Sequence, residues 1–299
     1  MWNVELKNIR IGPSGNSSSF YNEGYTSTVQ TPEWLSRRRL NAFEYSFGRG
    51  VRLTAATGVA IGAEMAKYDI AVSVHAPYYI NFATADEDNA EKSYMYVKSS
   101  VKAMRHMGAA RCVMHCGSAG RGDRKDALET VKRRLLQLAE ILRAEGLYEG
   151  IELCPETMGK YSQIGGPAEI LELCKVDPIY TPCYDFGHIN CLTQGGLKTA
   201  DDYKRLIDEC ADALGDAKTK NMHIHFSKIR YGAHGELNHL TFGDTAYGPE
   251  FEPLAEVIAA HAMTPVILCE SDGTMAEDAC AMKARLDAAF GCKNTNSGK

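Results

Sequence analysis

Apolar, β-branched runs alternate along the chain with longer segments whose apolar residues recur at helical spacing. The runs that predict strands lie at 6–12, 41–47, 70–75, 110–115, 150–156, 180–185, 221–227 and 265–270. The clearest helical segment is 126–144, where one face carries Leu128, Val131, Leu135, Leu138 and Leu142. Further helices are predicted at 87–107, 200–214, 250–262 and 276–289.

This alternation predicts an α/β fold. Eight strand-then-helix units predict a (β/α)8 TIM barrel that forms a single domain at residues 1–292, followed by a disordered polar tail at 293–299. A doubly wound open sheet is the alternative, but no GxGxxG motif follows the first strand. Two loops, at 12–39 and 228–249, are longer than a barrel requires. Because both follow predicted strands, we expect both at the catalytic face, where the strands end.

The composition restricts the classes of function. The chain has 299 residues, of which 44% are hydrophobic, and carries a formal charge of −5. Nucleic-acid-binding domains are usually basic, so this charge does not favour that class. Three bound divalent ions would add six charges, which changes −5 to about +1 and places the positive charge at the site.

The ten cysteines contain no paired CxxC motif, and residues 1–5 lack the basic and apolar regions of a secretory signal. No apolar run approaches the roughly 20 residues that span a bilayer. We therefore expect a cytoplasmic protein with reduced cysteines and no membrane contact.

Metal-liganding side chains stand near the ends of the predicted strands. They are His75, His115, Glu156, Asp185, His188, His223, Glu236, His239 and Glu270. Each alone has an ordinary explanation, such as a hydrogen-bonded histidine or an aspartate that caps a helix. Their joint occurrence at six strand ends exceeds the needs of one ion. It indicates a multinuclear site that hydrolyses a phosphate ester.

Two strands offer a choice of ligand. Period-two alternation places Glu152 and Glu156 on one face, and we assign the ligand to Glu156, at the end of the strand. His223 and His225 also share a face, and their spacing leaves open which binds metal and which supplies a supporting or phosphate contact. Histidine and carboxylate ligands without clustered cysteines favour zinc or manganese.

Over roughly residues 70–272 the chain resembles the endonuclease IV family of abasic-site DNA repair enzymes, which are xylose isomerase-like TIM barrels. The motifs that carry the resemblance are His75–Asn81, Met114–Ser118, Pro155–Lys160, Asp185–His188, Met222–Lys228, Gly235–His239 and Cys269–Glu270. The resemblance implies a (β/α)8 barrel with a trinuclear zinc site.

The resemblance also implies the ligands of each ion. Those of the first zinc would be His75, His115 and Glu156. Those of the second would be Glu156 as a bridge, Asp185, His223 and Glu270. Those of the third would be His188, Glu236 and His239. A hydroxide held between the first two ions would attack the phosphate 5′ to an abasic sugar, with Glu156 and Glu270 as the catalytic residues. We expect two to three Zn2+ ions, with Mn2+ as the alternative.

The partner implied by the resemblance is damaged double-stranded DNA, bound by a monomer. Side chains from the strand-end loops would enter the DNA, so that the abasic nucleotide is flipped into the pocket. The DNA-contacting or substrate-binding candidates are Tyr78, Tyr79, Asn81, Arg49, His225 and Lys228.

Three features depart from the family pattern. The loop of the third zinc normally has one residue between an Asp and its His, whereas two residues separate Glu236 from His239. The segment 12–39 does not match the family's first DNA-contacting loop. The acidic charge is the third departure, because phosphate contacts dominate DNA affinity.

The same superfamily contains sugar isomerases and epimerases, whose single ion is held by two Glu, one Asp and one His from four strand ends. That pattern is satisfied here by Glu156, Asp185, His223 and Glu270. A sugar or sugar-phosphate isomerase is therefore the second hypothesis. An isomerase with one ion does not need four further histidines as ligands, namely His75, His115, His188 and His239.

Overall fold

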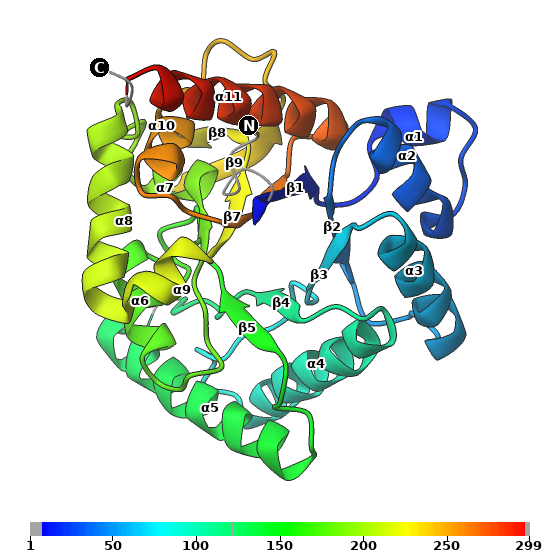
Figure 1. Ribbon diagram of the computed structural model, residues 1–299. Helices are drawn as coiled ribbons and strands as arrows, with labels where there is room; N and C mark the ends of the chain where they lie inside the picture. Colours follow the sequence, from blue (N-terminus) through cyan, green and yellow to red (C-terminus); the bar gives the residue numbers. More distant parts are fainter. Residues whose placement is uncertain (1–7, 121, 297–299) are drawn as a thin grey trace.

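Eight parallel strands form the wall of a barrel in the computed structural model, which describes residues 8–120 and 122–296 (Figure 1). The strands are β1 (Arg10–Pro13), β2 (Ala42–Ser46), β3 (Ala71–His75), β4 (Arg111–Met114), β5 (Glu152–Pro155), β6 (Cys183–Asp185), β7 (His223–Phe226) and β10 (Val266–Cys269). Hydrogen bonds join them as two arcs, β2-β3-β4-β5 and β6-β7-β10-β1. Parallel bridges of Ser14 with Glu44 and of Glu156 with Cys183 connect the arcs. The predicted (β/α)8 barrel is confirmed.

Helices surround the barrel and cover its outer face (Figure 1). The longer ones are α3 (Ala55–Lys67), α4 (Glu87–His106), α5 (Arg124–Ala144), α6 (Pro167–Cys174), α8 (Ala200–Leu214), α10 (Glu252–Ala260) and α11 (Met275–Asn296). In α5, the Asp123 side chain caps the helix by accepting a hydrogen bond from the Asp126 amide. Val131, Leu135 and Leu138 of this helix are fully buried, as the apolar periodicity predicts.

The segment after β1 is ordered, and the expectation of a loop at 12–39 is wrong. It contains α1 (Ser18–Asn22), the short 3-10 helix η2 (Thr28–Gln30) and α2 (Thr31–Arg37). Phe20 and Trp34 are fully buried, with ring centroids 5.4 Å apart. The Trp34 indole donates a hydrogen bond to Glu23. This small aromatic core stabilises a segment whose Ser, Gly and Asn content suggested irregular structure.

The expected loop 228–249 begins with an antiparallel hairpin of β8 (Lys228–Gly232) and β9 (Gly235–Leu240). Its register shifts by one residue: Tyr231 pairs with Glu236, but Arg230 pairs with Asn238. Leu237 therefore lacks a cross-strand partner in this register and is 59% exposed. This arrangement is a β-bulge.

Two short helices, α7 (Phe186–Leu192) and α9 (Asp216–Lys220), lie after β6 and before β7. The polar tail predicted at 293–299 overlaps α11 as far as Asn296, and its last three residues lie outside the described residues. Among the described residues, no disulfide bond is formed. Over residues 8–120 and 122–296, no helix combines the length and apolarity needed to cross a bilayer.

Alternate residues of each barrel strand point inward, which divides the interior into layers. The register between β6 and β7 pairs Asp185 with His225 and Cys183 with His223. The first pair therefore lies near the carboxyl ends of the strands, and the second lies two residues deeper. This difference in depth determines which side chains reach the open end.

Candidate metal centre

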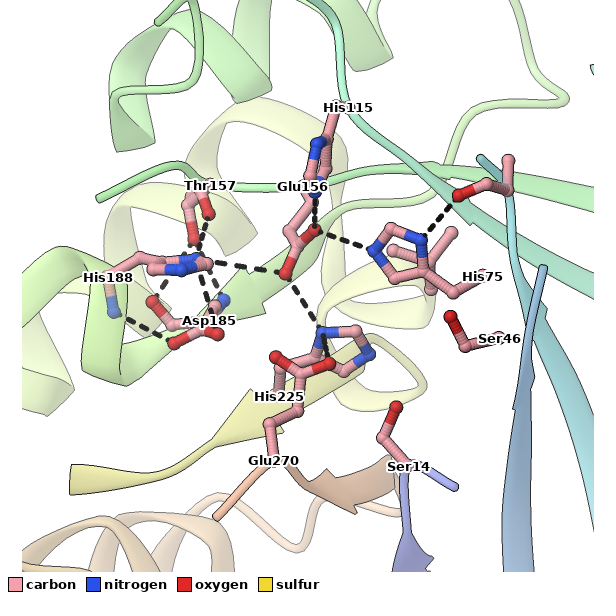
Figure 2. Close-up of polar contacts among 12 residues, drawn as sticks. Ser14, Ser46, His75, His115, Glu156, Thr157, Asp185, His188, His225 and Glu270 are labelled. Atoms are coloured by element: carbon pink, nitrogen blue, oxygen red, sulfur yellow. Dashed lines mark hydrogen bonds and ion pairs between the residues drawn. The ribbon is translucent and has the colours of Figure 1, made fainter. Parts of the chain in front are cut away.

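A cavity of about 690 Å³ opens at the carboxyl ends of the barrel strands, on the face predicted to be catalytic. Lys160 is the one lysine or arginine among the described residues that line it. Glu156 lies at the centre of the site and approaches histidine rings from several strands (Figure 2). The potential metal ligands in the cavity wall are His75, His115, Glu156, His188, Glu236, His239 and Glu270.

The first group consists of His75, His115 and Glu156, as predicted for the first zinc. Glu156 Oε2 lies 3.2 Å from His75 Nε2 and 3.1 Å from His115 Nε2. His75 Nδ1 lies 2.8 Å from the carbonyl oxygen of Ala76, a partner that can only accept a hydrogen bond. In the neutral ring, this contact leaves the lone pair on Nε2, on the side of Glu156.

Glu156 also belongs to a second group, with Asp185, His225 and Glu270. His225 Nδ1 lies 2.9 Å from Glu156 Oε1 and 3.4 Å from Glu270 Oε1. Asp185 caps α7, because its Oδ1 accepts a hydrogen bond from the His188 amide. Its other oxygen, Oδ2, is buried without a hydrogen-bond partner among the described residues. Oδ2 lies 3.2 Å from His188 Nδ1, so Asp185 combines a capping role with an ion-pair contact at the site.

His225, and not His223, joins this second group. Asp185 and His225 are paired in register, so they lie at the same depth, whereas His223 lies one layer deeper beside Cys183. His223 Nε2 contacts Glu44 Oε2 at 3.1 Å. This geometry favours His225 over His223 as the candidate ligand of the second group.

The third group consists of His188, Glu236 and His239. His188 Nε2 lies 3.4 Å from Glu236 Oε2, and His239 Nε2 lies 4.0 Å from Glu236 Oε1. The opposite nitrogen of His188 donates to the Thr157 carbonyl oxygen at 2.9 Å. His239 Nδ1 is paired with the Ser227 hydroxyl at 2.8 Å. Both rings are thus held with Nε2 toward Glu236.

The β-bulge accounts for the unusual spacing of Glu236 and His239. Residues three apart on a regular strand face opposite sides of it. The unpaired Leu237 adds one residue between them, which brings Glu236 and His239 to the same side of the hairpin. The longer spacing is therefore compatible with one shared group.

The carboxylates at the site need compensating positive charge, which favours bound cations. Burial raises the pKa of Asp185, and the charges of Glu270 and Glu156 act in the same direction. Burial alone would lower the pKa of His75 and of His188, but nearby carboxylates raise these values to about 9 and about 10. Protons on these rings thus balance the carboxylates in the absence of metal. Divalent cations would replace the protons and satisfy Asp185 Oδ2, and the imidazole–carboxylate donor set fits zinc or manganese.

Of the two aromatic candidates for DNA contact, Tyr78 lies at the cavity. Tyr78 lines it, is 54% exposed, and has its ring centroid 6.5 Å from that of His115. Tyr79 is also exposed and packs against Tyr96. Arg49 is exposed on the loop after β2 and is not among the residues that line the cavity.

Two other candidates for DNA contact are engaged in structural interactions. Asn81 Oδ1 accepts hydrogen bonds from the backbone amides of Ser118 and Ala83. Lys228 is buried, and its Nζ donates to Glu250 Oε1 at 2.6 Å and to the Asp244 carbonyl oxygen at 2.8 Å. Asn81 and Lys228 thus hold loops, and their contact with DNA stays a prediction.

Sequence reasoning missed Glu44, which is fully buried in the deeper layer. The sequence did carry a signal, since Glu44 is a carboxylate in the interior of the apolar run 41–47. A buried charge requires a partner, so such a residue indicates a polar contact inside the barrel. Glu152 was assigned a structural role, and it forms an ion pair with Arg111 at 2.8 Å.

A family model described as the xylose isomerase-like TIM barrel matches residues 35–287. An uncharacterized protein of Methanocaldococcus jannaschii is 28% identical over 239 residues, which cover 79% of this chain and 84% of that protein. A probable endonuclease 4 of Streptomyces avermitilis is 30% identical over 184 residues, or 58% of this chain. The match spans little more than half of that relative, 56% of its length. The resemblance to endonuclease IV is confirmed at this level.

Solved structures share the barrel at lower sequence identity. Endonuclease IV from Thermus thermophilus superposes with a TM-score of 0.64 at 20% identity, covering 88% of this chain and 95% of the other. An L-ribulose 3-epimerase gives a TM-score of 0.69 at 14% identity, covering 97% and 99%. Likeness at this identity shows the common fold and does not discriminate between the two activities.

Proposed function

This chain belongs to the xylose isomerase-like TIM barrel family, and we propose that it is a metal-dependent phosphodiesterase that cleaves DNA 5′ to abasic sites, as a deoxyribonuclease IV-type enzyme. One observation carries the proposal: three of the groups of potential ligands lie near the carboxyl ends of the strands, and Glu156 belongs to two of them. A shared carboxylate suits neighbouring ions. We propose two to three zinc ions, with manganese as the alternative.

Divalent ions bound in these groups would activate water as Lewis acids and neutralise charge on a phosphodiester. The chain's own residues would hold and orient the partners of that reaction. Glu156 and Glu270 approach the same nitrogen of His225 from two strands, which fixes the second group. Lys160, at the cavity wall, would pair with a substrate phosphate and orient it.

Tyr78 and Tyr79 would contact the DNA. Both residues are more than half exposed, so a bound partner could reach them. An aromatic ring stacks on a base regardless of sequence. Such contacts suit an enzyme whose target is a missing base and not a particular sequence. Extrusion of the nucleotide costs least where the base has already been lost.

The direct test uses a duplex that carries a tetrahydrofuran abasic analogue, with protein stripped by a chelator and then reloaded with Zn2+. We expect cleavage on the 5′ side of the analogue that leaves a 3′-hydroxyl and requires metal. Glu156→Gln and Glu270→Gln should each lower the rate by more than about 100-fold, since even residues that only support metal ligands contribute 10–100-fold.

Glu152→Gln is the matched control, because Glu152 lies on the same strand as Glu156 but pairs with Arg111. Its rate should stay near that of the wild type. Full turnover by either ligand variant would remove that residue from the mechanism.

A single-metal sugar isomerase or epimerase is the second candidate. The observation that favours it is the group of Glu156, Asp185, His225 and Glu270, which has the two Glu, one Asp and one His of that class. Metal-dependent conversion of a ketose, together with no cleavage of the abasic duplex, would decide for this alternative.

A further inference from the structure

Glu44 lies beneath the second metal group as a carboxylate shielded from solvent. Its side chain is fully buried, and it comes from the middle of β2. Register places Glu44 beside Ser73, one layer below the pair of Ser46 and His75 at the cavity. A charge at this depth persists only where neighbouring groups compensate it.

Side chains from neighbouring strands hold this carboxylate in one orientation. Ser14, which follows β1, donates to Oε1 at 3.1 Å, and Ser73 of β3 donates to Oε2 at 2.9 Å. His223 of β7 contacts the same Oε2 at 3.1 Å. Three contacts from three strands leave Glu44 little freedom to rotate.

The remaining partner of Glu44 is His225. His225 Nε2 lies 3.0 Å from Glu44 Oε1, and its Nδ1 lies 2.9 Å from Glu156 Oε1. The Nε2 contact is close enough for an ion pair but is not aligned as a hydrogen bond. The ring thus connects a buried carboxylate on one side with the second metal group on the other.

We propose that Glu44 is a positioning residue that keeps the proton of His225 on Nε2 and presents Nδ1 as the metal-binding atom. A carboxylate on the far side of a liganding imidazole fixes its tautomer and raises the basicity of the liganding nitrogen. His223 and the two serines position Glu44 in turn. The inference rests on metal binding by the second group, which both candidate functions require, and on no step of DNA cleavage.

The test is a Co2+ titration of the metal-free full chain, followed by the visible absorption of the bound ion. Glu44→Gln removes the charge at nearly the same volume. We expect one Co2+ per chain to bind about 10–100-fold more weakly than in the wild type, with a changed absorption band for that ion. The affinities of the other ions should remain within about twofold.

Asp177→Asn is the matched control, because Asp177 is also a buried carboxylate, held by Tyr148 and Arg143 at 2.6 Å each. It should lower the melting temperature and leave Co2+ affinity unchanged. If Glu44→Gln does not fold, the double variant Ser14→Ala/Ser73→Ala takes its place, since it keeps the charge but removes two contacts. We expect it to weaken the binding of one Co2+ by about fivefold, the effect of losing about 1 kcal/mol.

Failure of this inference and failure of the proposed function give different results. If the wild type binds Co2+ and a folded Glu44→Gln, or the double variant in its place, binds every ion equally well, the role of Glu44 is refuted. If the wild type binds no Co2+, the metal-dependent function fails with it.

Discussion

Two histidines on β7, separated by a single residue, have opposite electrostatic surroundings. Burial lowers the pKa of His223 to about 4, despite its contact with Glu44. Burial acts on His225 in the same direction, but the surrounding acidic groups raise its pKa well above the ordinary value. Sequence spacing could not separate them, because residues two apart share a face. Their depth depends on the register with β6, which no local pattern encodes.

At the residue scale, the preference for His225 over His223 predicts different metal contents for two variants. His225→Gln should lose one ion per chain, since Nδ1 is a ligand atom of the second group. His223→Gln should keep the wild-type number, because its Nε2 contacts Glu44 and lies one layer below the ligands. Zinc titration calorimetry on the metal-free variants measures both. Loss of an ion in His223→Gln with retention in His225→Gln would reverse the assignment.

At the element scale, the eight barrel strands lie close to their predicted positions, since β-branched runs bounded by turn residues are a strong local signal. The segments 12–39 and 228–249 differ from the loops that the sequence predicts. Their polar, glycine-rich composition favours irregular structure, but non-local contacts outweigh it. Burial of Phe20 against Trp34 orders the first, and pairing of β8 with β9 orders the second. The hairpin has a functional consequence, because its bulge places Glu236 and His239 beside His188.

The third metal group depends on a close approach between this hairpin and the loop after β5. A Cβ atom at Gly159 would lie 2.8 Å from both Glu236 Cβ and His188 Cδ2. Gly159→Ala should therefore displace the third group and lower the bound zinc by about one ion per chain. Gly243→Ala is the control, because its Cβ would meet nothing closer than the Thr241 hydroxyl at 3.4 Å. Equal zinc contents in the two variants, measured by elemental analysis, would exclude this group as a metal site.

At the scale of the whole molecule, the barrel brings residues from 75 to 270 into one cavity. The convergence was predictable, because strand ends of a parallel barrel meet at one face. The structural engagement of Asn81 and Lys228 was not, since both depend on backbone groups of distant loops. The net charge of −5 would oppose binding of DNA, and bound divalent ions would reverse that balance at the cavity itself. Under the proposed function, metal loading would therefore govern both the chemistry and the attraction of a polyanionic substrate.

The number of metal ions per chain tests the central claim most directly. Protein purified without chelator, or reloaded with zinc and freed of excess metal, is analysed for zinc and manganese by mass spectrometry against its peptide concentration. Three ligand groups, two of which share Glu156, predict two to three ions per chain. A value of one ion or none would contradict a multinuclear phosphodiesterase centre.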